Sequence, residues 1–239
     1  MTKTVKPGRV VVNKNSINDV YSHVCAKRSL RDRFEMGMNS YVSVHRTGWL
    51  RKENTLVDGA EEHLRNEYAM YRALNTAKLT GKIVPTPDFS HGLKEEEDGV
   101  FSIVISQINA AAPMWEYARA VLSGHMSEEL WVALCSEVGR ALKVFHSKGF
   151  AHKDLHSGNI IMEVNKSSKW SANFIDFGMT IKTISLSAEE AGMWKERDRT
   201  DLLKDLNEVV IVYGLKAPVS NEIKEVYAAG LLAFHKAAK

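Results

Sequence analysis

The sequence predicts an α+β fold in two lobes, a small antiparallel sheet with one helix followed by a mainly helical lobe. Apolar and polar residues alternate between residues 34 and 50 and again between 89 and 108, which is the period of strands. The stretch between them has helical spacing, and after residue 127 the periodic segments are helical. We therefore expect an arm at residues 1–30, a small lobe at 31–108 and a large lobe at 109–239.

The small lobe is expected to hold five strands and one helix. Three short strands come first, near residues 34–36, 41–44 and 49–50, with a turn at 46–48. Asp58 and Glu61 have the spacing of a helix N-cap, and apolar residues follow at helical spacing until Gly81: Leu64, Tyr68, Tyr71 and Leu74. Prolines 85 and 87 favour an extended segment. Strands near 89–93 and 100–108 are joined by an acidic turn at 94–99.

The large lobe should begin after a hinge at residues 109–113 and consist mainly of three helices. Ser127 starts the first, which ends at Lys148 and Gly149 and has an apolar stripe of Leu130, Leu134, Val138, Ala141, Leu142 and Phe145. Thr200 is the predicted cap of a second helix that closes at Gly214. A last helix is expected from about Ser220.

The composition is that of an ordinary globular protein, with 239 residues, 44% hydrophobic and 26% charged. No apolar run approaches the ~20 residues of a membrane helix, so we expect no membrane span. The formal charge of +3 favours neither nucleic acid nor a membrane surface, and we expect no nucleic-acid partner. Two cysteines and no signal-peptide pattern predict a cytoplasmic protein with reduced thiols.

The most informative motif is the run Phe-Ala-His-Lys-Asp-Leu-His-Ser-Gly-Asn at residues 150–159, followed by Phe-Ile-Asp-Phe-Gly at 174–178. Asp154 and Asn159 are five residues apart in one loop, and Asp176 follows 22 residues after Asp154. This is the spacing of a phosphoryl-transfer site, in which one carboxylate orients a hydroxyl while a second carboxylate and an amide hold metal on ATP. Each piece alone is weak, but their order and local context indicate this chemistry.

On these motifs the chain resembles the protein-kinase-like superfamily, over about residues 34–213. The resemblance implies the two-lobed kinase fold, with ATP and Mg²⁺ (or Mn²⁺) as cofactors. It implies that Asp154 accepts or orients the proton of the incoming hydroxyl, and that Asn159 and Asp176 bind the metal.

In the small lobe, the resemblance asks for a lysine at the phosphates and a glutamate on the next helix. Lys52 and Glu67, 15 residues apart, are our candidates, with a solvated Lys52 as the alternative. The phosphate-covering loop would be residues 37–42, with Gly37 and Ser40 as contacts, although it has one glycine where the family usually has three. Ser106 and Ile108, at the end of the last small-lobe strand, complete the expected cofactor-binding set.

Two histidines in the loop, His152 and His156, are four residues apart and could suggest zinc. Gly149 and Gly158 flank them and make the required helix doubtful. By the resemblance, His152 is a structural histidine that braces the backbone near Asp176. His156 replaces the lysine of common Ser/Thr kinases and could donate a hydrogen bond to the transferred phosphate. A histidine there also occurs in sugar- and aminoglycoside-directed relatives.

Several kinase features are missing. No Ala-Pro-Glu follows Gly178, only 61 residues remain after it, and Lys153 stands where regulated kinases carry arginine. We therefore expect a truncated large lobe, an activity independent of prior phosphorylation, and a monomer. Such minimal kinases look like bacterial effector kinases of the HopBF type, which act on a host chaperone. An effector of this kind would be secreted into the host cell cytoplasm.

Three functions remain open at the level of sequence. The first is an ATP-dependent kinase for a Ser/Thr hydroxyl of a protein, because the short C-terminus leaves little chain to enclose a small substrate. The second is a kinase of the same fold for a sugar, glycolipid or aminoglycoside, which His156 favours. The third is a non-catalytic kinase-like binding module, against which the complete set of central polar residues argues.

Overall fold

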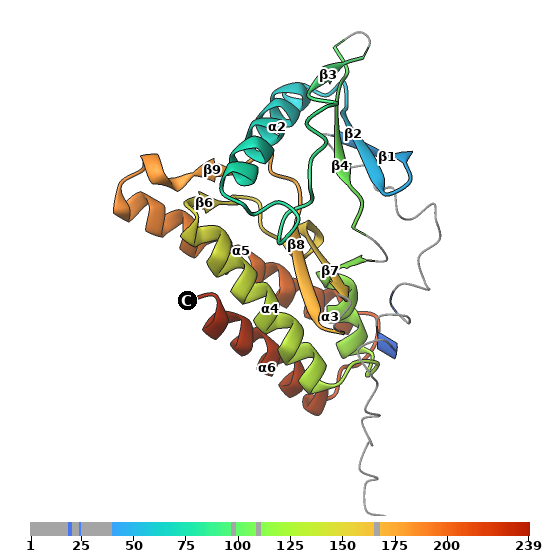
Figure 1. The fold of residues 1–239 in the computed structure, drawn as a ribbon. Coiled ribbons are helices and arrows are strands. Elements are labelled where there is room, and N and C mark those ends of the chain that lie inside the picture. Colours follow the sequence, from blue (N-terminus) through green and yellow to red (C-terminus); the bar gives the residue numbers. More distant parts are fainter. Residues whose placement is uncertain (1–18, 21–23, 25–39, 97–98, 109–110, 165–167) are drawn as a thin grey trace, which may run out of the picture.

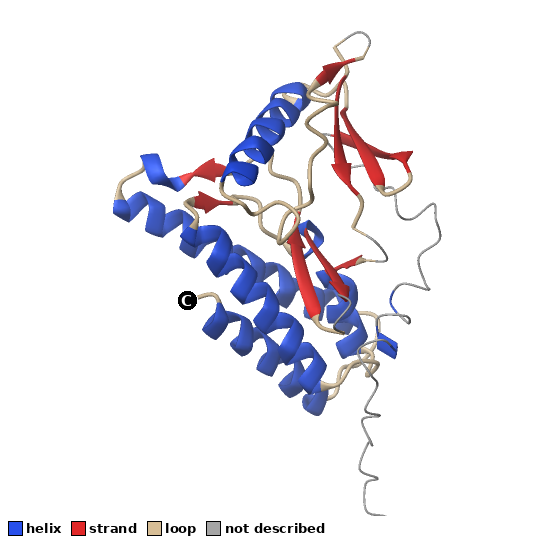
Figure 2. Ribbon diagram, viewed as in Figure 1, coloured by secondary structure: helices blue, strands red, loops and turns tan. Residues whose placement is uncertain are grey.

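The computed structural model describes residues 19–20, 24, 40–96, 99–108, 111–164 and 168–239. A small antiparallel sheet with one long helix stands over a larger, mainly helical part (Figures 1 and 2). The α+β class and the division into a sheet lobe and a helical lobe are confirmed. The strand expected near residues 34–36 and almost all of the arm at 1–30 lie outside the described residues.

The small sheet has four antiparallel strands in the order β1-β2-β4-β3. They are β1 (Ser40–Arg46), β2 (Trp49–Asn54), β3 (Lys94–Glu95) and β4 (Phe101–Ser106). Gly48 has φ 79°, a conformation that suits the tight turn between β1 and β2. Helix α2 (Ala60–Thr76) packs on β2 and β4.

The predicted strand at residues 89–93 is wrong. The chain turns there, and the short strand β3 follows it, in the stretch expected to be a turn. The cause is Asp88, whose carboxylate accepts hydrogen bonds from the Ser90 backbone N–H at 3.0 Å and from its hydroxyl at 2.5 Å. An aspartate bonded to the backbone two residues on favours a turn over a strand.

Helix α2 also starts differently from the prediction. Its N-cap residue is Gly59, in the left-handed conformation at φ 83°, and not Asp58. Glu61 and Glu62 lie in the first turn, where their charges interact favourably with the helix dipole. The helix ends at Thr76, five residues before the predicted end at Gly81.

The helical lobe contains a three-stranded sheet in the order β5-β7-β8, formed by β5 (Ala112–Pro113), β7 (Ile160–Val164) and β8 (Trp170–Phe174). Helix α3 (Met114–Leu122), which the sequence analysis did not predict, follows β5 directly. Strands β6 (Phe150–Ala151) and β9 (Ile181–Lys182) pair with each other. Short 3₁₀ turns occur at η2 (Ser157–Asn159) and η3 (Thr183–Ser185).

Two helices of this lobe begin where the sequence predicted. Helix α4 (Glu128–Ser147) is capped by Ser127, whose hydroxyl accepts from the Leu130 N–H at 3.4 Å. Helix α6 (Asn221–Ala237) is capped by Ser220. The two helices lie side by side and pack along their length (Figure 1).

The predicted start of the third helix at Thr200 is wrong. Helix α5 runs over Ala188–Gly214 and begins with a capping box between Ser187 and Glu190. Its first three turns are rich in charge and lack an apolar stripe, so their periodicity gives no helical signal. None of the helices in the described ranges is long and apolar enough to cross a membrane.

Candidate active site

A buried lysine connects the small sheet to the segment that follows β8. Lys52 on β2 is 6% exposed, and its Nζ lies 2.6 Å from Glu67 Oε2 and 3.0 Å from Asp176 Oδ1. Glu67 is on α2 and is 1% exposed. The structure thus brings together three site residues that the sequence placed far apart along the chain.

The charges of this cluster support one another. Burial by itself lowers the pKa of Lys52, but the charges of Glu67 and Asp176 outweigh it and raise that pKa above its usual value. Burial raises the pKa of Glu67, with Lys52 opposing the shift. Burial also acts to raise the pKa of Asp176, but hydrogen bonding to His63 and the Lys52 charge hold it well below the usual range. Lys52 is therefore a fixed cation and Asp176 a fixed anion at neutral pH.

Helix α2 contacts each residue of the Asp-Phe-Gly segment. His63 Nε2 lies 3.0 Å from Asp176 Oδ1, and the Asn66 side-chain amide donates to the Gly178 carbonyl at 2.5 Å. Phe177 is buried and packs edge-on against Tyr71 of α2. A Cβ on Gly178 would lie 1.9 Å from His63 Nε2, so only glycine fits.

The sequence analysis named neither His63 nor Asn66. Both precede Glu67 on α2, His63 by one helical turn, and this spacing is the signal that could have found His63.

Asp154 is exposed, on the segment between β6 and η2. The preceding residue, Lys153, has φ 66°, a strained conformation for a non-glycine residue. A buried carboxylate holds this backbone: Asp198 of α5 accepts hydrogen bonds from the N–H groups of His152 and Lys153, both at 2.8 Å. It also pairs with His146 Nε2 at 2.9 Å. The sequence gave no reason to single out Asp198, because it lies in the part of α5 that was not predicted.

The two histidines of the loop are engaged separately. His152 is fully buried, and its Nε2 lies 2.9 Å from the Ile175 carbonyl, so it braces the backbone next to Asp176 as the resemblance implied. His156 Nδ1 accepts from the Gly158 N–H at 3.1 Å. Neither histidine belongs to a group of possible metal ligands in the described part of the chain, so the zinc alternative has no support.

Asn159 and Asp176 fit the metal-binding roles proposed for them. The Asn159 amide nitrogen donates to the Asp154 carbonyl at 3.0 Å and lies 3.4 Å from the Asp154 carboxylate. This orientation leaves the amide oxygen to bind a cation. Asp176 uses Oδ1 for Lys52 and His63, which leaves Oδ2. Oxygen ligands of this kind suit Mg²⁺.

One other set of side chains has the proximity of a metal site. Ligand atoms of His63, Glu67 and Asp176 all lie within 4.8 Å of one another. The Lys52 ammonium contacts both carboxylates of this set, and its charge would repel a second cation. We therefore assign these residues to positioning the lysine and Asp176 rather than to holding metal.

The remaining expected nucleotide contacts lie around the sheet. Gly37 is outside the described residues. Ser40 is the first residue of β1, is 8% exposed and pairs with Asn54 of β2. The Ser106 hydroxyl accepts from the Thr86 N–H at 2.8 Å, which ties β4 to the extended proline segment, and Ile108 is half-buried beyond the end of β4. Their contact with a nucleotide stays a prediction.

The fold and the site define the chain as a protein-kinase-like phosphotransferase. The model of the lipopolysaccharide kinase (Kdo/WaaP) family matches residues 27–222, which is most of the chain. The chain therefore belongs to this family.

Solved structures agree with the fold. The structure of "WaaP in complex with acyl carrier protein" is 14% identical with a TM-score of 0.51, covering 91% of this chain and 85% of that one. A crystal structure of a kinase domain is 12% identical with a TM-score of 0.47, covering 64% of this chain and 51% of that one. No curated protein matches the chain.

The family changes the ranking of functions made from the sequence. A kinase is supported, and a kinase family implies ATP and a divalent metal ion as cofactors. A lipopolysaccharide kinase family supports the small-molecule alternative better than a protein Ser/Thr acceptor. The HopBF-type effector assignment, with its host chaperone and secretion, finds no support in these comparisons.

Proposed function

We propose that the chain transfers the γ-phosphate of ATP to a hydroxyl of a sugar in a lipopolysaccharide or a related glycolipid. The observation that carries the proposal is the buried Lys52–Glu67 pair in contact with Asp176, in a chain of the lipopolysaccharide kinase family. A non-catalytic binding module would not need to keep this buried charge cluster, whose assembly costs desolvation energy.

The residues of the chain have separate parts in the proposed transfer. The acceptor oxygen forms a bond to the γ-phosphorus while the bond from phosphorus to the β–γ bridging oxygen breaks, and ADP leaves. Asp154, whose carboxylate is exposed, receives the proton of the acceptor hydroxyl. Lys52 stabilises negative charge on the phosphates, with Glu67 fixing its position. His156 donates a hydrogen bond to the transferred phosphoryl group.

We propose Mg²⁺, with Mn²⁺ as a substitute, as the metal, held by Asn159 and Asp176. When bound, the metal ion neutralises charge on the phosphate oxygens. The contribution of the chain is to fix these two ligands, through the Asp154 carbonyl for Asn159 and through Lys52 and His63 for Asp176. We also keep as proposals the arm at 1–30, the boundary of the lobes between residues 108 and 109, and the nucleotide contacts of Gly37, Ser40, Ser106 and Ile108.

The test is transfer of radiolabelled phosphate from ATP, with Mg²⁺, to purified rough lipopolysaccharide and, in parallel, to a whole-protein extract. We expect label in the lipopolysaccharide fraction, dependence on the divalent ion and loss with a chelator. Asp154→Asn serves as the inactive control and should bind Mg-ATP as the wild type does, whereas Asp176→Asn should also lose metal-dependent nucleotide binding. Label above the Asp154→Asn control only in protein bands would restore the protein-acceptor function and overturn this one.

A further inference from the structure

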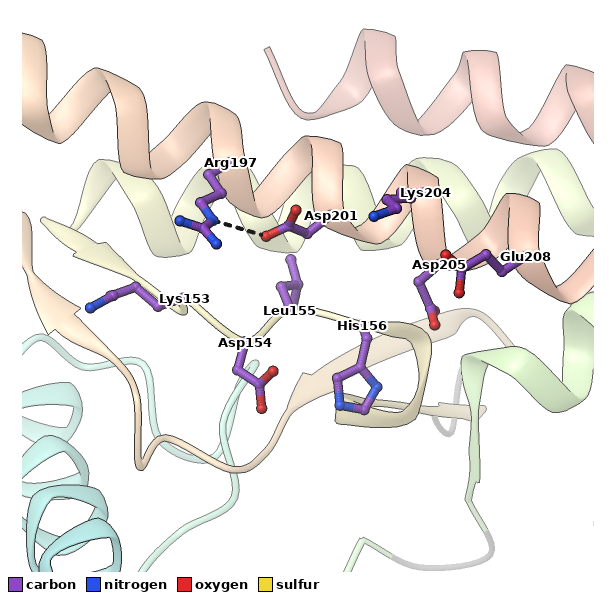
Figure 3. Close-up of a pocket in the computed structure, with 9 residues that line it drawn as sticks. All are labelled: Lys153, Asp154, Leu155, His156, Arg197, Asp201, Lys204, Asp205 and Glu208. Atoms are coloured by element: carbon purple, nitrogen blue, oxygen red, sulfur yellow. Dashed lines mark hydrogen bonds and ion pairs between the residues drawn. The ribbon is translucent and has the colours of Figure 1, made fainter. Parts of the chain in front are cut away.

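A pocket of about 290 Å³ lies where the loop that carries Asp154 meets helix α5 (Figure 3). Four of its lining residues come from the loop and five from α5: Lys153, Asp154, Leu155, His156, Arg197, Asp201, Lys204, Asp205 and Glu208. The five α5 residues recur at helical spacing and therefore share one face of the helix. The pocket thus extends directly from the carboxylate that is proposed to receive the acceptor proton.

The lining is almost entirely polar. Eight of the nine residues have ionisable side chains, and the ninth, Leu155, is 1% exposed. Such a surface gives an acyl chain or an aliphatic side chain nothing to pack against. The volume is at the lower end of the range for small-molecule sites. A single hydroxyl-rich ring fits this lining better than an extended peptide.

Several of the charged groups already have partners inside the protein. Asp205 Oδ2 accepts from the Ser157 N–H at 2.7 Å, which anchors the loop to α5. Arg197 Nε lies 3.3 Å from Asp201 Oδ2, the one ion pair among the residues drawn in Figure 3. The Lys153 ammonium lies 4.4 Å from the centre of the Trp194 ring, a cation–π contact.

Two residues of the pocket are left for a ligand. Lys204 and Glu208 are both exposed and are one helical turn apart. Across the described residues, neither forms an ion pair or a side-chain hydrogen bond. The pocket therefore offers one cation and one carboxylate at fixed spacing.

His156 adds a donor. Its Nδ1 accepts a hydrogen bond from Gly158, so in the neutral ring the proton is on Nε2. In Figure 3 its ring and the Asp154 carboxylate extend to the same side of the loop, away from α5. A hydroxyl held at this place could meet both groups.

We propose that this α5 pocket is the acceptor subsite and that Lys204 and Glu208 determine its specificity. Glu208 accepts hydrogen bonds from hydroxyls of the sugar ring, and Lys204 pairs with a negatively charged substituent, a carboxylate or a phosphate, of the same acceptor. The inference rests on the proposed function and adds to it the residues that select the acceptor.

The test compares Lys204→Met and Glu208→Gln with two matched controls on α6, Lys224→Met and Glu225→Gln, which are exposed and do not line the pocket. Initial rates are measured with Mg-ATP and rough lipopolysaccharide, varying each substrate in turn. We expect the two pocket variants to raise the KM for lipopolysaccharide at least tenfold and to change the KM for ATP less than twofold. The α6 variants should have the wild-type KM for both substrates.

Chemically modified acceptors identify the anionic group. Rough lipopolysaccharide is used untreated, after reduction of its carboxyl groups, and after removal of its phosphates. One treatment should raise the wild-type KM at least tenfold and leave the KM of Lys204→Met unchanged, because the partner of the lost charge is already gone. Equal losses in wild type and Lys204→Met would overturn the pairing.

The outcomes separate the two proposals. If the wild type phosphorylates lipopolysaccharide and both pocket variants keep its KM, the subsite is wrong and the proposed function stands. If the wild type transfers no phosphate to lipopolysaccharide while the protein is folded and binds Mg-ATP, the proposed function fails and this inference fails with it.

Discussion

His63 lies against the metal-binding aspartate, with its Nε2 3.0 Å from Oδ1 of Asp176. The same carboxylate oxygen contacts Lys52 Nζ at 3.0 Å, so two cationic or hydrogen-donating groups hold one oxygen. The hydrogen bond to Asp176 raises the pKa of His63 above its usual value, which favours the charged ring. Asp176 itself has φ 65°, a conformation that needs support from its surroundings. Helix α2 supplies that support.

His63→Ala should lower kcat/KM for Mg-ATP by about 10- to 100-fold, because residues that orient a metal ligand typically matter to this extent. His63→Gln, which keeps a hydrogen-bond donor, should recover part of the loss. The measurement is a titration of activity with Mg²⁺ at fixed ATP. His125→Ala, at an exposed position outside the site, is the control and should behave as wild type. An unchanged Mg²⁺ dependence in His63→Ala would show that the contact with Asp176 has no part in metal binding.

Lys52→Ala should cut kcat/KM by about 10²–10³, the size of effect expected when a preorganised charge is lost from the transferring phosphates. Glu67→Ala should cost less, because Lys52 then keeps its contact with Asp176. Arg51→Ala is the matched control, since the Arg51 guanidinium pairs with Glu53 at 2.7 Å and Glu96 at 3.0 Å, away from the site. Steady-state rates with Mg-ATP decide between these values. A fully active Lys52→Ala would move the phosphate-binding role to another residue.

The parts of the site that the sequence revealed are those encoded locally. Asp154 and Asn159 are close along the chain, and Asp176 follows in a strand-like apolar context, so their spacing survives as a pattern. Lys52 and Glu67 could be paired only through the order of elements that the resemblance supplied. His63 and Asp198 escaped notice because their importance comes from contacts with residues 113 and 45–46 positions away.

The error in helix α5 had a functional consequence. Residues 188–199 are mostly charged, and the only local signal for the helix is the capping box of Ser187 and Glu190. Without this half of the helix, Arg197 and the wall of the α5 pocket were missing from the sequence-based picture. The short C-terminus then appeared unable to build a small-molecule site, which is why a protein acceptor was ranked first.

Gly230→Ala should destabilise the fold by about 1–3 kcal/mol, the cost of overpacking a tight contact. Gly230 is where α6 meets the buried Trp131 of α4, and a Cβ there would lie 2.1 Å from the indole nitrogen. That nitrogen donates to the Tyr227 carbonyl at 3.0 Å and cannot move without losing the bond. Gly192→Ala is the control on α5, where a Cβ meets no atom within 4 Å, and it should stabilise by up to about 1 kcal/mol. Chemical denaturation of both variants tests the opposite signs.

The stability of the protein should fall as the pH drops below about 6.5, in part because of His152. Burial lowers the pKa of this histidine, and its Nδ1, where a second proton would bind, has no hydrogen-bond partner within the described residues. The unfolded chain therefore binds a proton near pH 6.5 that the folded chain does not. The contribution is fully present above that pH and is lost toward the folded pKa, at up to about 1.4 kcal/mol per pH unit.

His152→Asn keeps a donor for the Ile175 carbonyl but does not titrate, so its free energy of unfolding should depend less steeply on pH. Denaturant unfolding between about pH 7.5 and 5 measures both slopes, and the exposed His125→Asn should keep the wild-type slope. Parallel curves for wild type and His152→Asn would mean that His152 is protonated equally in the folded and unfolded chains. Because the same ring fixes the carbonyl next to Asp176, His152→Asn should also retain more activity than His152→Ala at pH 7.5.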